Sequence, residues 1–400
     1  MTATDPEVST SLVQRLRLPG ELGRKPNVLF AFIAAHVVND FTATSLPAFL
    51  PAIEDEFGLG YFELGLLSLT FAVLSGIAQP FLGNFADRNG RRRAALVFGF
   101  ISTAIGFVAI GAAPVFPLVV LASLFCGLGG STYHPQATAL LVKSYPDERG
   151  RTLGFHGWGG SIGHFLAPVV VAVGVTAVGW RWTIAVLAIP SLITALGLHT
   201  RLPETNPNPG ATLRGAASRD LVVMALTFGL LGMVLRGFLA FLPTYLVERD
   251  WSLTQAGAIT TLILVVGMFA QPMGGSIFDR IGGRRVFLGA AVGSTASLVL
   301  FVVFTGWLAL LGVTGMAFFV FALFPVSLAM ASEIAGAERT GAAAGIVFGI
   351  SGLSTATVPA VLGAIADESS LRFALSLLIV VSAGAILMSL GLPDKIRSPD

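Results

Sequence analysis

The side chains that could do chemistry in this sequence are few, and several of them lie close together in one apolar segment. His36 and Asp40 are separated by four residues, so a helix would place them on one face, one turn apart. Histidine titrates near neutral pH, and a neighbouring carboxylate shifts that titration. This pair therefore predicts a proton relay, and we expect His134 from a later segment to be its third member.

A second set of polar side chains could bind a small molecule. An ionisable group inside a membrane segment is costly, and by default it marks a functional site. A guanidinium group can also hold a carboxylate or a phosphonate through two hydrogen bonds, which makes Arg236 suited to an anion. We expect the following residues to bind substrate: Asn39, Tyr133, Gln136, His156, Trp158, His164 and Arg236.

Metal binding is an alternative use of the same histidines. Imidazole suits Zn²⁺, Ni²⁺ and Cu²⁺, but no His-x-x-x-His or Cys/His spacing accompanies the histidines, and the single cysteine, Cys126, lies in an apolar run. Each imidazole could also simply bond a backbone carbonyl. We expect no resident metal and no cofactor, and a divalent metal as the transported ion stays an alternative.

The composition sets the environment of these groups. Of the 400 residues, 54% are hydrophobic and only 12% are charged, whereas a soluble domain has about 25% charged residues. This indicates an all-α protein whose surface faces lipid. The net charge of +2 gives no reason to expect a nucleic-acid partner.

About 20 mostly apolar residues are needed to cross a bilayer, and the sequence contains twelve such segments. We expect transmembrane helices near 27–50, 62–86, 94–113, 117–142, 151–175, 181–200, 221–247, 255–278, 286–305, 307–332, 340–365 and 372–392.

The loop charges predict the orientation of the chain. Twenty of the 24 Lys and Arg residues lie on the side of the N-terminus, and only three lie on the opposite side. Because positive loops remain in the cytoplasm, we expect a multi-pass protein of the inner (plasma) membrane. Its tails, 1–26 and 393–400, would both be cytoplasmic.

An internal repeat divides the chain into two parts. Gln79-Pro80 recurs as Gln271-Pro272, and a series of glycines, charges and prolines recurs at nearly the same offset. We therefore expect two parallel six-helix bundles, 27–200 and 221–392, joined by a cytoplasmic linker at 201–220. Such halves enclose a central site and rock about it.

The most specific motif follows the second segment. The stretch Gly83–Arg93, GNFADRNGRRR, resembles the signature loop of the major facilitator superfamily, and Gly275–Arg285, GSIFDRIGGRR, resembles its second copy. This resemblance implies the superfamily's twelve-helix transporter fold and a cytoplasmic gate. The residues expected in the gate are Gly83, Asp87, Arg88, Gly90, Arg91, Arg92, Gly275, Asp279, Arg280, Arg284 and Glu333.

A narrower resemblance rests on the polar residues within the segments. His36-x-x-Asn39-Asp40 and Tyr133-His134-Pro135 are similar to the fosmidomycin-resistance branch of the superfamily. That branch implies proton-driven export of drugs or small anionic metabolites. The superfamily resemblance implies that the first and seventh segments face each other, so Asp40 and Arg236, which each precede a proline by seven residues, are expected to be partners or alternates.

The sequence therefore favours a monomeric secondary transporter in the lipid bilayer that exchanges protons for a small organic or anionic compound or drug by alternating access. Proton-coupled import of a carboxylate or nutrient, and divalent metal transport, are the alternatives. An ATP-driven pump is disfavoured because no GxxxxGK[ST] loop occurs. An enzyme is disfavoured because no nucleophile–base set stands out, and a receptor needs neither gates nor buried titratable groups.

Overall fold

The computed structural model describes residues 26–394, and every regular element in that range is helical. Twelve helices are long and apolar enough to cross a membrane, which confirms the predicted number. The elements of the first half are α2 (Pro26–Phe57), α3 (Tyr61–Asn89), α4 (Arg92–Ala112), α5 (Phe116–Ser144), α6 (Arg149–Val178), α7 (Trp180–Val186) and α8 (Ala188–Arg201).

The second half follows a linker that contains the short α9 (Leu213–Ala216). Its elements are α10 (Arg219–Val247), α11 (Leu253–Ile281), α12 (Gly283–Val303), α13 (Gly306–Ala335), η2 (Ala337–Arg339), α14 (Thr340–Ala356), α15 (Val358–Glu368), α16 (Leu371–Ser376) and α17 (Leu378–Leu390). The pairs α7–α8, α14–α15 and α16–α17 each form one span that is broken by a short irregularity. Helices are the expected solution, because lipid offers backbone groups no hydrogen-bond partner.

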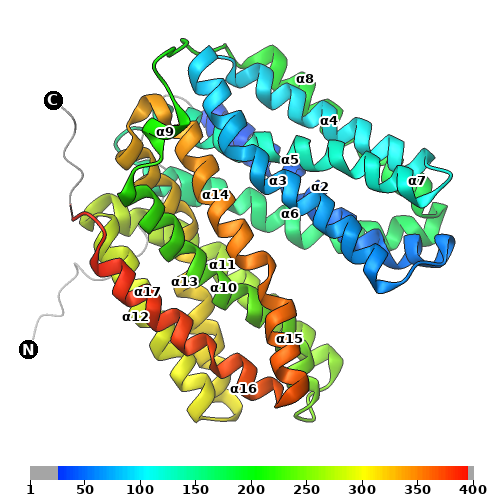
Figure 1. Ribbon diagram of the computed structural model, residues 1–400, viewed down its shortest axis with the longest axis vertical. Coiled ribbons are helices and arrows are strands. Elements are labelled where there is room, and N and C mark those ends of the chain that lie inside the picture. The colour runs from blue at the N-terminus through cyan, green and yellow to red at the C-terminus, as the bar shows by residue number, and fades with distance from the viewer. Residues whose placement is uncertain (1–25, 395–400) are drawn as a thin grey trace, which may run out of the picture.

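The two halves lie side by side in Figure 1, with α2–α8 on one side and α10–α17 on the other. They meet mainly where α3 packs on α14 and where α6 packs on α11. We call the end of the molecule that carries α9 and the linker residues 202–218 the linker face. The end that carries α7 and α16 is the distal face (Figure 1).

Glycines let the halves approach closely near the linker face. A Cβ atom on Gly83 would collide with the carbonyl of Gly341, and a Cβ atom on Gly275 would collide with the carbonyl of Gly150. Small residues allow such backbone contacts between membrane helices. The two repeated signature glycines therefore occupy equivalent crossings, one between α3 and α14 and one between α11 and α6.

A second pair of crossings explains the repeated Gln-Pro sequence. The backbone of Pro80 leaves no room for a side chain at Gly345, and the backbone of Pro272 leaves none at Gly154. Each half thus supplies one proline-containing helix and one glycine to the other half. The repeat in the sequence is therefore a repeat of the contacts between the halves.

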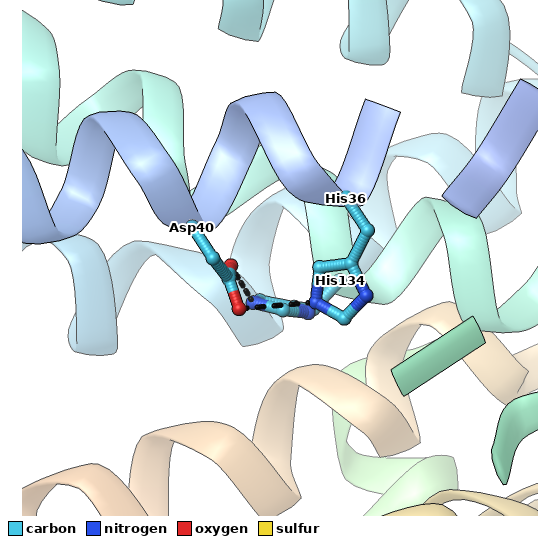
Figure 2. Close-up of side chains that lie close together, drawn as sticks. All are labelled: His36, Asp40 and His134. Carbon is cyan, nitrogen blue, oxygen red and sulfur yellow. Dashed lines mark ion pairs between the residues drawn. The ribbon is translucent and has the colours of Figure 1, made fainter. Parts of the chain in front are cut away.

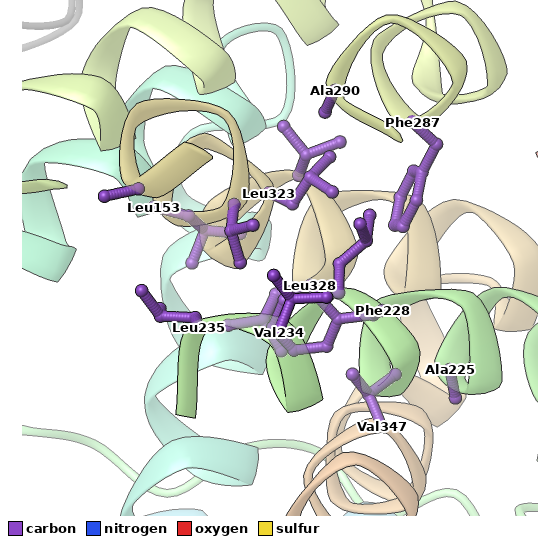
Figure 3. Close-up of a cluster of buried hydrophobic side chains, with 14 of the residues drawn as sticks. Leu153, Ala225, Phe228, Val234, Leu235, Phe287, Ala290, Leu323, Leu328 and Val347 are labelled. Atoms are coloured by element: carbon purple, nitrogen blue, oxygen red, sulfur yellow. The ribbon is translucent and has the colours of Figure 1, made fainter. Parts of the chain in front are cut away.

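The largest apolar core also joins the two halves. In Figure 3, Leu153 of α6 lies in the same cluster as Phe228 of α10 and Leu323 of α13. A separate cluster, which includes Phe49, Phe107 and Trp180, involves only first-half residues. The halves therefore share a core in one region, while the first half has a core of its own elsewhere.

Candidate functional site

Asp40, on α2, is the centre of a polar cluster drawn from three helices. Asp40 as a whole residue is only 7% exposed. Its Oδ2 lies 3.2 Å from Nε2 of His36, and its Oδ1 lies 3.5 Å from Nε2 of His134 on α5 (Figure 2). Nδ1 of His164, on α6, lies 3.5 Å from Oδ2. The structure thus brings together all three residues that the sequence predicted as a proton relay, and it adds His164.

The hydrogen bonds of His36 fix the position of its ring hydrogen. Nδ1 lies 2.9 Å from the carbonyl oxygen of His156. A carbonyl can only accept, so Nδ1 carries a hydrogen, and a neutral His36 presents a lone pair at Nε2. Since an ionised carboxylate is also only an acceptor, the contact between Nε2 and Asp40 is favourable when one proton lies between them. His36 and Asp40 therefore form a pair that shares a single proton.

Tyr133 and His156 form a second layer of contacts around His36, on α5 and α6. The Tyr133 hydroxyl donates to the carbonyl of Phe32 at 2.6 Å and lies 2.9 Å from Nε2 of His156. Because the hydroxyl has one hydrogen, Nε2 of His156 must be the donor in the second bond. The His156 ring stacks on the His36 ring at 4.2 Å between centroids. Both predicted substrate residues are buried and hold His36 in place.

Asn39 and His164 complete the surroundings of the carboxylate. The Asn39 amide donates to Oδ1 of Asp40 at 2.8 Å. His164 donates from Nδ1 to the Gly160 carbonyl at 2.7 Å, and its side chain is 53% exposed. A Cβ atom on Gly160 would run into the Asp40 carboxylate. The glycine-rich stretch of α6 therefore brings His164 to Asp40, and it leaves one side of the cluster open.

The second half contributes an aromatic ring rather than a charge to this cluster. Phe348 of α14 stacks on His134 at 4.4 Å between centroids. The expected pairing of Asp40 with Arg236 is not present in this structure. Among residues 26–394, the ion pairs of Asp40 are all with imidazoles, and Arg236 is exposed and forms none. The reason is that α2 packs mainly on α6 and α5, not on α10.

Near the linker face, Asp87 of α3 binds the start of a helix in the other half. The carboxylate is 3% exposed. It accepts from the backbone nitrogens of Gly341 at 3.3 Å and Ala342 at 2.8 Å, and it forms an ion pair with Arg92. A carboxylate is stabilised by the partial positive charge at a helix N-terminus. Asp87 therefore holds α14 of the second half.

Asp279 of α11 makes the reciprocal contact. It accepts from the backbone nitrogens of Gly150 at 2.8 Å and Arg151 at 2.9 Å, at the start of α6 in the first half. The equivalent of Arg92, Arg284, pairs instead with Asp394 at 2.6 Å. In both contacts a carboxylate accepts from backbone nitrogens at the start of a helix in the other half. They differ because Arg92 pairs with Asp87, whereas Arg284 pairs with Asp394.

Comparison with known proteins identifies the family. The sequence model of the Major Facilitator Superfamily matches residues 32–267 and 224–399. The chain belongs to this superfamily. It is a membrane-spanning transporter rather than an enzyme.

Individual relatives agree with this assignment. The fosmidomycin resistance protein of Escherichia coli is 26% identical over 86% of this chain and 87% of its own length. A probable sulfoacetate transporter of Cupriavidus necator is 29% identical over 62% of this chain and 65% of its own length. Among solved structures, the transporter FucP in its outward conformation superposes with a TM-score of 0.76 at 14% identity, over 93% of this chain and 99% of that chain.

Two residues that the sequence predicts to bind substrate, Gln136 and Trp158, make contacts between helices in this superfamily transporter. Gln136 is fully buried and accepts from Arg92 at 3.2 Å, so it lies with the gate residues and not beside Asp40. Trp158 donates from Nε1 to the Met268 carbonyl at 2.8 Å, which ties α6 to α11. Both contacts link distant helices, and no spacing within one segment could indicate them.

The remaining predicted gate residues lie on the linker face of the transporter. Arg88 and Arg91 are exposed beside a cavity of about 470 Å³. Glu333 is half-buried beside a second cavity of about 520 Å³, which Asp279 also lines. Gly90 ends α3 in a left-handed backbone conformation. The side chain of Arg280 is exposed.

An acidic residue that no motif assigned to the gate follows each half of the chain. Glu204 accepts from the backbone nitrogens of Arg93 at 3.1 Å and Ala94 at 3.0 Å, at the start of α4. Asp394 binds Arg284 in the second half. The repeated Leu-Pro-acid sequences at 202–204 and 392–394 carried this signal.

Proposed function

We propose that this transporter exports a small organic anion in exchange for protons, acting as a monomer whose linker face is cytoplasmic. The observation that carries the proposal is the buried carboxylate of Asp40 surrounded by imidazoles from three helices. A buried ionisable group that shares a proton with a histidine can hold that proton in one state of the carrier and release it in another.

The two gate contacts support alternating access. Asp87 and Asp279 each join one half to a helix start of the other, and both lie toward the linker face. The separate core of the first half is consistent with a distal face that is less tightly joined. Transport would require both carboxylates to leave their helix starts when the linker face opens.

Arg236 supports an anionic substrate. A charged arginine side chain that faced lipid would have a high free-energy cost. We therefore place the exposed side chain of Arg236 in a water-filled route between the halves. The guanidinium could bind a carboxylate or phosphonate in two-point fashion. The names of two relatives, a fosmidomycin resistance protein and a probable sulfoacetate transporter, support export and a small organic anion, respectively.

The decisive experiment is transport by purified protein in liposomes, with fosmidomycin and sulfoacetate as probes. An imposed proton gradient is expected to drive probe movement against the direction of proton flow, and Asp40→Asn is expected to abolish this coupling. His199→Ala is the matched control, because His199 lies on α8 outside the cluster.

Both gradient polarities must be tested, since they separate export from import. Probe movement in the same direction as the protons would replace the proposal with a proton symporter. Full gradient-driven activity in Asp40→Asn would remove Asp40 from the coupling site.

A further inference from the structure

The cluster around Asp40 has the geometry of a metal-ligand set, which the proposed function does not use. His36, Asp40 and His134 each direct one ligand atom into the same space, and these atoms all lie within 4.8 Å of one another. Figure 2 shows the two imidazoles converging on the carboxylate. Ligands bound to zinc at 2.0–2.1 Å in a tetrahedron lie about 3.3 Å apart. Nε2 of His36 lies 3.2 Å from Oδ2 of Asp40, and Nε2 of His134 lies 3.5 Å from Oδ1, so each imidazole is at about that separation from one of the two carboxylate oxygens.

The surroundings also match those of a metal site. Metal-binding histidines usually donate their other ring nitrogen to a carbonyl or carboxylate, which orients the lone pair toward the ion. His36 does this through Nδ1 and the carbonyl of His156, which leaves Nε2 free as a ligand. Asp40 is oriented in turn by the amide of Asn39. Two of the three ligands therefore have the supporting contacts that a metal requires.

We propose that His36, Asp40 and His134 bind one divalent transition-metal ion, of which Zn²⁺ is the best match. Two imidazoles and a carboxylate are a ligand set that Zn²⁺ accepts. The half-exposed His164 marks the open side of the cluster, where a water molecule would complete the coordination.

The ion would act as an inhibitor of proton-coupled export. It fixes the ring of His134, which stacks on Phe348 of the second half. A bound ion therefore links α2 and α5 to a residue that must move when the halves rock. This inference goes beyond the proposed function, because it concerns a ligand other than the substrate.

The test is equilibrium binding to the full-length, metal-free protein in detergent, with Zn²⁺ measured by calorimetry and Co²⁺ by visible absorption. We expect one ion per chain and the intense visible bands of a four-coordinate cobalt site. His134→Ala is expected to weaken Zn²⁺ binding more than tenfold, and Asn39→Ala to weaken it by about 10–100-fold, as loss of a supporting contact does. His199→Ala should bind as the wild type does.

Folding of each variant is checked by gel filtration and thermal unfolding, and His134→Gln replaces His134→Ala if the latter fails. Absence of stoichiometric binding to the wild type would overturn the proposal. Unchanged binding in folded variants of both His134 and Asp40 would also overturn it, because the ion would then lie elsewhere. Binding needs neither substrate nor a gradient, so its failure is independent of the liposome experiment.

Discussion

At the residue scale, the polar cluster depends on two layers of side chains. Asp40 contacts His36, whose Nδ1 donates to the backbone carbonyl of His156, and the ring of His156 in turn donates to the hydroxyl of Tyr133. A buried polar group that loses its partner costs about 1–3 kcal/mol. The supporting layer should therefore affect both stability and coupling, although it touches neither substrate nor proton directly.

Tyr133→Phe tests the supporting layer. The change removes the hydroxyl between the Phe32 carbonyl and the His156 ring, so we expect the free energy of unfolding to fall by about 1–3 kcal/mol. The measurement is thermal unfolding of the purified protein. Tyr245→Phe is the matched control, since Tyr245 is also a buried tyrosine and, among residues 26–394, its hydroxyl forms no hydrogen bond. Equal effects of the two changes would refute the role of Tyr133.

At the element scale, glycines decide which helices can meet. Gly160 lets α6 lie against α2 at the level of Asp40, and Gly90 ends α3 in a left-handed conformation that the linker covers. The gates are also element-scale features, because a carboxylate at the end of one helix binds the start of another.

Gly160→Ala is expected to disrupt the site, because the added methyl group would meet the Asp40 carboxylate and the His36 ring. We expect lower thermal stability and loss of proton-coupled transport. Gly197→Ala is the control, since no atom lies within 4 Å of an added Cβ there. At this helical position alanine should be neutral or stabilising by about 0.5–1 kcal/mol. Wild-type stability and coupling in Gly160→Ala would contradict the close packing of α6 on α2.

The two gate carboxylates are expected to differ in strength. Asp87→Asn removes an ion pair with Arg92 as well as a negative charge at a helix start. Asp279→Asn removes only the charge at the helix start, because Arg284, the equivalent of Arg92, pairs with Asp394. We expect Asp87→Asn to lower the transport rate more than Asp279→Asn, with equal amounts of both proteins in the membrane. Transport assays normalised by immunoblot provide the measurement. Normal transport by Asp87→Asn would exclude a gate role for this residue.

At the scale of the whole molecule, the halves are joined through α3–α14 and α6–α11. The contacts of the gates lie toward the linker face, and Arg236 of α10 is exposed. The conformation therefore predicts that water reaches Arg236 from the distal side.

Arg236→Cys provides a direct test of this accessibility. The only natural cysteine, Cys126, is 2% exposed and should not react. A membrane-impermeant thiol reagent is expected to modify the new cysteine when added at the distal face and not when added at the linker face. Thr227→Cys, at a fully buried position on the same helix, should be protected from both sides. Modification of Arg236→Cys only from the linker face would reverse the assignment of the open side.

The sequence predicted those features that are local or repeated. Hydropathy located all twelve spans because each must cover the same thickness of lipid, and the four-residue spacing placed His36 beside Asp40. The contacts of Gln136 and Trp158, and the separation of Asp40 from Arg236, depend on how distant helices pack in one conformation. No spacing within a segment encodes such packing.

The linker also limits how far the halves can separate. Backbone hydrogen bonds join Thr205 to Gly90 and Asn208 to Asp87, so this part of the chain travels with the first half. Gly215, seven residues beyond Asn208, accepts from Arg339 of the second half. A fully extended chain covers about 3.3–3.6 Å per residue. The intervening segment can therefore span at most about 25 Å. Deletions within it should reduce how far the two halves can separate without altering the Asp40 cluster or the position of Arg236.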